Sequence, residues 1–94
     1  MNSNKLEFRV ALVDYANKGT PGWWDWHGEM FANEADAKAL AARTCGETAH
    51  VYTQEIFCRE TTMVNGAEMG DCVYMVAKKP RNTKKWIAVA KERL

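Results

Sequence analysis

The feature that most constrains the fold is a two-residue alternation near the start of the chain. Leu6, Phe8, Val10 and Leu12 are large and apolar, and the residues between them are charged or smaller. Successive side chains of a β-strand point to opposite faces of a sheet, so this period predicts a half-buried strand over residues 5–15.

A hairpin is expected to follow this strand. Residues 17–22 (Asn-Lys-Gly-Thr-Pro-Gly) are rich in turn-forming types and predict a loop. Residues 23–31 are rich in aromatic side chains and predict a second strand, antiparallel to the first. The loop between the two strands is longer than a tight turn, and binding loops are often of this kind.

A helix is predicted from Glu34 to Cys45. Asn33 is a favourable N-cap, Asp36 is placed where a carboxylate faces free backbone amides, and Gly46 suits the position after the last turn. The alanine-rich sequence has a high helix propensity. The inward-facing stripe is expected to consist of small or apolar side chains, namely Ala37, Leu40, Ala41 and Thr44.

Strand-forming residues return from His50 to Arg59 and extend through residues 61–64. Asn65-Gly66 is the strongest short hairpin signal in the chain. Gly70-Asp71 interrupts the returning arm and indicates a β-bulge, after which residues 72–77 predict a further strand.

The last segment, after a turn at 79–83, allows two interpretations. Trp86, Ile87 and Val89 favour a strand that pairs with residues 72–78, whereas Thr83 as an N-cap before alanine and charged residues favours a short terminal helix over 84–94. The strand is the preferred interpretation.

The predicted class is therefore α+β, with residues 1–94 forming a single domain. We expect an antiparallel sheet of four to five strands with one helix packed on one face, in the order β-β-α-β-β-β. One helix covers only one face of such a sheet, so the other face must be polar or covered by something else. The apolar side chains expected on that face favour a homodimer: Ala11, Val13, Tyr15, Tyr52, Ile56 and Cys58.

No metal or cofactor is expected. The chain has no Cys-x-x-Cys or His-x-x-x-His spacing, and residues 19–22 lack the phosphate-loop pattern. Cys45, Cys58 and Cys72 are odd in number and most simply reduced thiols, as in a cytoplasmic protein, with a Cys58–Cys72 bridge as the alternative. Convergence of His50 with Cys58 and Cys72 has no support in the sequence.

Enzyme chemistry is the less favoured class. Cys45 is expected at a helix C-terminus, where the helix dipole disfavours a thiolate nucleophile. A small enzyme would have to use the polar residues of the first hairpin, and such sets occur in any small domain. These residues are Asp14, Asp25, His27 and Glu29.

Three tryptophans within four positions, Trp23, Trp24 and Trp26, form the most unusual cluster. Strand alternation places Trp24 and Trp26 on one face and Trp23 on the other. In one interpretation two of them cap the core under the helix and the third covers the loop. In the other, one or two are exposed anchors for a partner, because tryptophan is enriched in interface hot spots.

Charge is strongly divided along the chain. Residues 78–94 contain seven basic and one acidic residue, a net charge of +6, whereas residues 1–77 have a net charge of −5. This basic hairpin is either a solvated edge that blocks aggregation or a docking surface for phosphates or an acidic protein. Tyr74 and Trp86 would supply stacking for a nucleic acid. The basic side chains concerned are Lys78, Lys79, Arg81, Lys84 and Lys85.

The small size, the helix Glu34-Ala35-Asp36-Ala37-Lys38-Ala39 after a β-hairpin, and the lack of a catalytic motif resemble small phage-encoded accessory proteins, including inhibitors of bacterial defence systems. The resemblance implies a larger bacterial protein or complex as partner, met in the host cytoplasm. No run of about 18 apolar residues is present to span a membrane. We therefore expect a non-enzymatic binding module, with a nucleic-acid-binding protein that uses the basic hairpin as the alternative.

Overall fold

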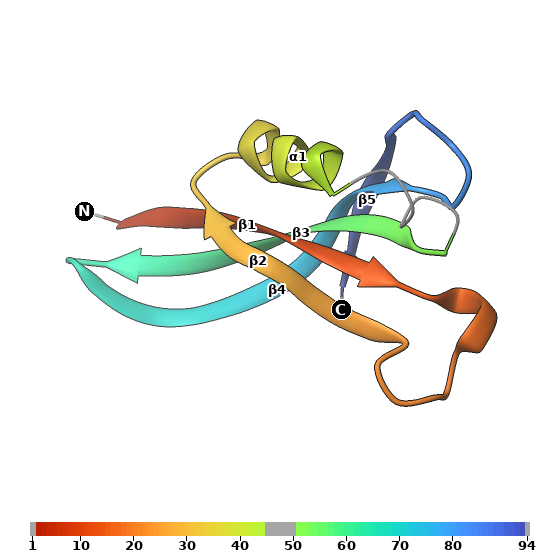
Figure 1. The fold of residues 1–94 in the computed structure, drawn as a ribbon. Coiled ribbons are helices and arrows are strands. Elements are labelled where there is room, and N and C mark those ends of the chain that lie inside the picture. The colour runs from red at the N-terminus through yellow and green to blue at the C-terminus, as the bar shows by residue number, and fades with distance from the viewer. Residues whose placement is uncertain (1, 45–50, 94) are drawn as a thin grey trace.

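The computed structural model describes residues 2–44 and 51–93. Within these residues the chain forms five strands, one α-helix and a short 3-10 helix (Figure 1). The elements are β1 (Asn2–Val13), η1 (Tyr15–Asn17), β2 (Trp24–Phe31), α1 (Glu34–Arg43), β3 (Thr53–Val64), β4 (Ala67–Lys79) and β5 (Ile87–Arg93). The expected combination of an antiparallel sheet with a helix is confirmed.

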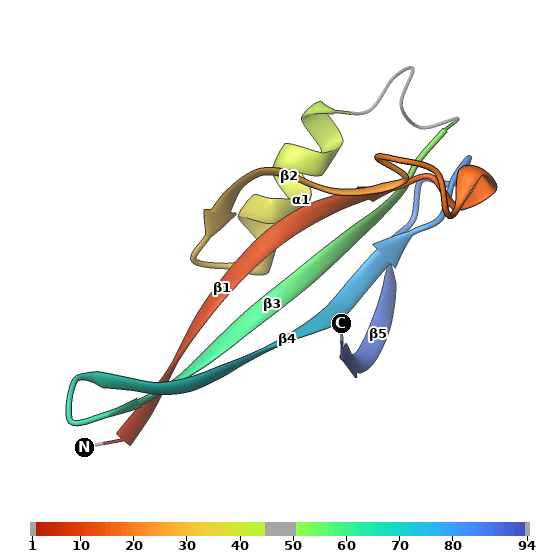
Figure 2. The same ribbon diagram turned by 90° about the horizontal axis from the view of Figure 1, so that it is seen from below.

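The strands form one sheet in the order β2-β1-β3-β4-β5, which differs from their order along the chain. Because β2 and β3 both pair antiparallel with β1, they run parallel to each other on either side of it. α1 connects them and packs on one face of the sheet, called here the helix face (Figure 2). The opposite face, the helix-free face, has no helix over it among the described residues.

β1 buries side chains on both of its faces. Phe8 and Val10 belong to the apolar cluster under α1, whereas Ala11 and Val13 belong to a smaller cluster on the helix-free face. The predicted alternation is therefore present, but the two sets of positions are both buried, because both faces of this central part of the strand are covered.

The loop between β1 and β2 begins earlier than expected. β1 ends at Val13, so the predicted end at residue 15 is wrong and Tyr15 lies in η1. The Asn17 side chain donates a hydrogen bond to the Asp14 carboxylate over 2.7 Å, which favours a turn over an extended strand at this point. The backbone N–H of Asp14 also donates to the carbonyl of Trp23 over 2.6 Å and closes the loop.

β2 contains a bulge opposite Arg9. Pairing shifts from Val10–His27 to Phe8–Phe31, so the intervening residues of β2 face a single residue of β1. Gly28, with φ of 77°, takes the left-handed conformation in this bulge, and Arg9 Nε donates to its carbonyl over 3.0 Å.

α1 begins as expected. Asn33 Oδ1 accepts a hydrogen bond from the backbone N–H of Asp36 over 2.8 Å, as an N-cap should. The predicted inward stripe is confirmed, with Ala37 and Ala41 fully buried and the other two members half-buried. The helix ends at Arg43, and the expected end at Cys45 and Gly46 lies outside the described residues.

Two polar side chains fix the C-terminal end of α1 to the sheet. Gln54 Nε2, on β3, donates to the carbonyl of Ala41 over 3.0 Å. Thr44 Oγ1 donates to the carbonyl of Leu40 over 2.8 Å and lies 3.0 Å from His27 Nε2 on β2. The Thr44 backbone N–H also donates to both carbonyls, over 3.1 and 3.2 Å, so the side-chain bonds add to the backbone bonds at this end of the helix.

The β3–β4 hairpin turns at Asn65-Gly66, where φ is 50° and 82°. Two residues in the left-handed region match the turn type that this sequence favours, so the hairpin is confirmed. A bulge follows at Met69, one residue before the predicted position, and β4 continues through it. β3 begins at Thr53, so the predicted strand is wrong at Val51 and Tyr52, and its expected first residue, His50, lies outside the described residues.

The last element is a strand, as preferred. β5 pairs antiparallel with β4 at the edge of the sheet. A turn in the connection between them is held by the Thr83 N–H, which donates to the Pro80 carbonyl over 3.1 Å. The free edge of β4 offers unpaired backbone groups, which explains why this segment extends instead of forming a helix.

The expectation for the uncovered face is partly wrong. Register places Ile56 opposite Val10 and Cys58 opposite Phe8, so both side chains lie under α1. Ala11 and Val13 do lie on the helix-free face, but they are fully buried there. The apolar surface that favoured a homodimer is therefore smaller than the sequence suggested.

The N-cap offers a direct test of what holds α1. Replacing Asn33 with alanine removes the acceptor for the Asp36 N–H and is expected to lower the free energy of unfolding by about 1 kcal/mol in urea titrations. Asn33→Ser, the matched control, keeps an acceptor and should retain most of the stability. Equal losses in the two variants would contradict the capping role.

Candidate functional site

An aromatic cluster covers part of the helix-free face. The ring centroids of Trp24 and Trp26 lie 4.8 Å apart at 75°, and the ring of Phe57 lies 5.9 and 5.4 Å from them, at 70° and 85°. Such edge-to-face pairs each add about 1 kcal/mol beyond the burial of area. The cluster packs over Ala11 and Val13 and covers them where a second helix or sheet could otherwise lie.

The interpretation that places two tryptophans under the helix is wrong. His27 bonds to Thr44 at the end of α1 and so points to the helix face. Because neighbouring residues of a strand point to opposite faces, Trp26 must point away from the helix. Each tryptophan of the cluster is half-buried, so each keeps some surface for contact.

Trp23 precedes β2 and does not follow its alternation. Its ring packs against the same cluster as Trp24 and Trp26, so its expected place on the opposite face is wrong. The ring centroid lies 6.2 Å from that of Tyr15, and the Lys18 Nζ lies 5.7 Å from the Trp23 ring. Trp23 thus covers the loop, as one interpretation expected.

A shallow hollow of about 30 Å³ lies beside Trp26 and is called here the Trp26 hollow. The Arg9 guanidinium lies 5.3 Å from the Trp26 ring centroid, and Arg59 forms an ion pair with Asp71 over 2.8 Å. Both arginines are therefore held in place beside apolar surface. The lining residues are Glu7, Arg9, Trp26, Met30, Phe57, Arg59 and Val73.

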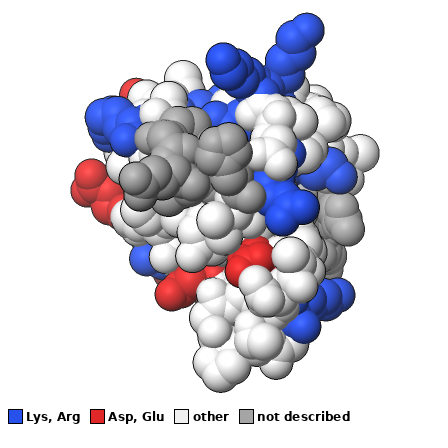
Figure 3. All heavy atoms as spheres, turned by 45° about the vertical axis from the view of Figure 1, so that its right-hand side comes forward, with Lys and Arg blue, Asp and Glu red and all other residues white. Residues whose placement is uncertain are grey.

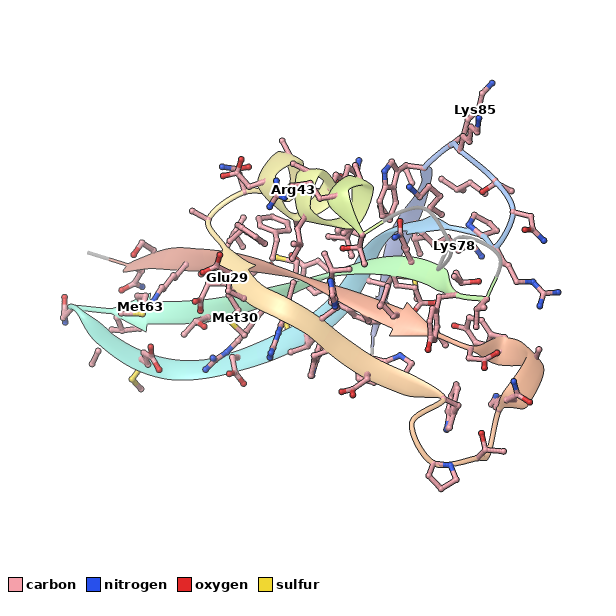
Figure 4. All side chains as sticks on the ribbon, viewed as in Figure 1. Glu29, Met30, Arg43, Met63, Lys78 and Lys85 are labelled. Carbon is pink, nitrogen blue, oxygen red and sulfur yellow. The ribbon has the colours of Figure 1, made fainter. Side chains whose placement is uncertain are left out.

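Met30 is the most accessible apolar part of this hollow, with 39% of its surface exposed. It lies on the side of the sheet away from α1 (Figure 4). Sequence reasoning missed Met30, Arg9 and Arg59. Strand alternation places Phe57 and Arg59 on the same face of β3, so the sequence could have indicated Arg59. Arg9 could not be found in this way, because it reaches the hollow only through the pairing of β1 with β2 on one side and β3 on the other.

A larger hollow of about 290 Å³ lies beside η1. Glu55 is only 2% exposed on its wall, and the Tyr15 hydroxyl donates to Glu55 Oε2 over 2.5 Å. A buried carboxylate needs such donors, because removal from water disfavours its charge. The hollow is lined by Tyr15, Thr53, Glu55, Met75, Lys78 and Pro80, and Tyr15 and Thr53 also line a neighbouring hollow of about 280 Å³ with Ala16, Val51 and Arg81.

The five basic residues of the C-terminal hairpin do not share one surface. Lys78 lines the hollow beside Glu55, whereas Lys79 points to the helix face, where its Nζ lies 5.2 Å from the Trp86 ring centroid. The remaining three, Arg81, Lys84 and Lys85, are exposed in the connection between β4 and β5. Figure 4 shows Lys85 at the far end of this connection and projecting from the body, well apart from Lys78.

Tyr74 is not available for stacking on a nucleic acid. It is 7% exposed, and its hydroxyl donates to Glu60 Oε1 over 2.8 Å. Hydrogen bonding with Cys58 and Glu60, together with burial, raises the pKa of Tyr74 above its usual value. The expectation that Tyr74 is an exposed platform is wrong, because β4 directs this ring under α1.

The cysteines are not arranged for catalysis in the described part of the chain. Cys58 and Cys72 are free thiols, so the alternative of a bridge between them is wrong. Burial raises the pKa of the Cys58 thiol, which disfavours the reactive thiolate. Cys45 and His50 lie outside the described residues.

The polar residues proposed for a small enzyme have separate neighbours. Asp14 accepts from Asn17, His27 bonds to Thr44, and Asp25 and Glu29 are exposed on β2. Among residues 2–44 and 51–93, no group of three or more His, Cys, Asp or Glu side chains is placed to hold a metal ion.

None of the helices within the described residues is long and apolar enough to cross a membrane. Comparisons with protein-family models, curated proteins and solved structures find no match for this chain.

The bond between Tyr15 and Glu55 is expected to anchor η1 to the sheet. Tyr15→Phe removes the donor to a buried carboxylate and should lower the free energy of unfolding by about 2 kcal/mol. Tyr52→Phe is the matched control, because the structure shows no hydrogen bond from the Tyr52 hydroxyl within the described residues. Chemical denaturation compares the two, and equal stability of both variants would contradict the anchoring role.

Proposed function

We propose that this protein is a non-enzymatic binding module that occupies the surface of a larger protein through its helix-free face. The observation that supports this most is the Trp26 hollow, where half-buried aromatic rings, an exposed methionine and two held arginines meet. Aromatic residues, methionine and arginine are the types enriched at protein interfaces.

The hollow is also prepared for binding before a partner arrives. Trp26 is fixed by two edge-to-face contacts, Arg9 by its bond to the Gly28 carbonyl, and Arg59 by its pair with Asp71. Side chains that are already ordered lose little entropy on association, so more of the contact energy becomes affinity. The neighbouring loop is closed by backbone bonds and holds Trp23 beside this surface.

We propose a bacterial protein or complex in the host cytoplasm as the partner. The role of the chain would then be that of a phage-type accessory or inhibitor protein. The support for this part is the general layout of the sequence, with its small size and helix after a β-hairpin. The partner surface should be largely apolar at its centre, with a carboxylate near Arg9, because that guanidinium borders the hollow.

Capture of a partner from bacterial lysate tests the proposal when the wild-type protein is compared with variants that alter the helix-free face. Immobilised wild-type protein should retain a defined partner, identified by mass spectrometry, and Met30→Glu should lose it because a charge is placed in the apolar hollow. Met69→Glu is the matched control, since Met69 is 66% exposed on β4 and lies away from the hollow.

Retention of the partner by Met30→Glu, or its loss in both variants, would contradict a role for this face. A second copy of the chain is the competing occupant. A dimer in light scattering that dissociates in Met30→Glu would replace the proposed partner with self-association.

Trp26 is expected to be the dominant contact once the partner is known. Trp26→Ala should weaken binding by about 2 kcal/mol or more in calorimetric titrations, the magnitude of an interface hot spot. Its stability must be measured in parallel, because loss of a packed tryptophan costs about 3–5 kcal/mol of folding free energy. Arg9→Ala probes the same hollow with less disturbance of packing, and normal affinity in both folded variants would place the contact elsewhere.

A further inference from the structure

Trp86 supports two lysines that come from distant parts of the chain. Its ring is half-buried against the apolar cluster under α1. Lys38 Nζ, from α1, lies 5.6 Å from the ring centroid, and Lys79 Nζ, from β4, lies 5.2 Å from it. Only the tertiary structure brings Lys38 to the C-terminal hairpin.

The ring and its neighbours form what is called here the Trp86 patch, made of Lys38, Lys79, Lys84, Lys85 and Trp86. Two ammonium groups beside one ring are attracted to its electron-rich face, which offsets part of their mutual repulsion and restricts their motion. Lys84 and Lys85 are exposed on the segment that leads into Trp86. Figure 3 shows Lys and Arg side chains that project into solvent at the upper end of the molecule, with others spread over the rest of this view.

Among the side chains that the structure describes, Glu34 is an acidic neighbour of this patch, since it pairs with Lys38 over 2.7 Å on the partly exposed surface of α1. An exposed pair of this kind contributes little to stability and is readily exchanged for another anion. The patch therefore presents two ammonium groups beside a partly accessible indole ring, together with two exposed lysines on the segment that leads into it. This region is separate from the Trp26 hollow, which lies on the other face of the sheet.

We infer that the Trp86 patch binds the phosphate backbone of a nucleic acid. A nucleic acid presents closely spaced negative charges that several lysines can neutralise at once, with release of counterions. The exposed part of the indole offers a surface for base contact, as in proteins that bind single strands. The inference does not depend on the proposed protein partner, because it concerns different residues on a different face.

Fluorescence anisotropy with a labelled single-stranded DNA of about 20 nucleotides tests the inference on the full chain. If four lysines each neutralise one phosphate, the slope of log affinity against log salt should be about −2.8. Affinity should then fall about 50-fold between about 50 and 200 mM salt. A double-stranded probe of the same sequence shows whether the indole contributes, since stacked bases are less accessible to it.

Charge-removing variants locate the site. Lys84→Gln combined with Lys85→Gln should reduce the magnitude of the slope by about 1.4, and Lys38→Gln alone by about 0.7. Lys5→Gln combined with Lys18→Gln is the matched control, because it removes the same charge from exposed lysines on β1 and on the loop before β2. The control should leave the slope unchanged.

Four results would overturn the inference. The first is the absence of binding at low salt, and the second is an equal loss in the control and the Lys84/Lys85 variant. The third is displacement of the probe by poly-glutamate as effectively as by unlabelled DNA, which would assign the patch to acidic protein surfaces. An unchanged slope in Lys38→Gln would show that α1 takes no part and that the patch as defined is wrong.

Discussion

The burial of β1 on both faces is the constraint on which the rest of this structure depends. Val10 is covered by α1 on one side, and Ala11, its neighbour in sequence, is covered on the other. The described elements include one α-helix, and it covers one face of β1, so the cover on the other face comes from side chains. The Trp24 and Trp26 side chains of the adjacent strand form this cover, since indole rings are large enough to bury small residues such as Ala11.

A cover made of side chains differs from one made of a second helix or sheet in one respect. It covers the small residues beneath it, yet its own outer surface remains partly open to solvent. The stabilisation of β1 and the accessibility of the aromatic cluster therefore have the same cause. This shared cause explains why a hollow bordered by Trp26 and two arginines exists on a domain of this size.

Several polar side chains of the domain form hydrogen bonds that connect one element of the fold to another. Gln54 and His27 bond to the end of α1, Glu55 holds the η1 tyrosine, and Glu60 accepts from both Asn4 and Tyr74. The helix fully buries two alanines and packs Leu40 against the same cluster, and these hydrogen bonds add to that apolar contact. Side chains used in this way differ from the convergent acid, base and nucleophile that catalysis requires.

The sequence by itself determined the local elements of this protein. Alternation gave β1, the Asn33 cap and alanines gave α1, and Asn65-Gly66 gave the β3–β4 hairpin, because each depends on residues close together in the chain. The tertiary structure decided which face each strand turned to the helix. That choice depends on the crossing of α1 over β1 and on bulges at Gly28 and Met69, which shift the register. It placed Trp23, Trp24 and Trp26 on the face away from the helix, and it brought Tyr15 to Glu55 and Lys38 to Trp86. None of these pairs is visible in the sequence, because contacts between distant residues follow from the order in which the strands pair, and a shift of register by one residue turns every side chain to the other face.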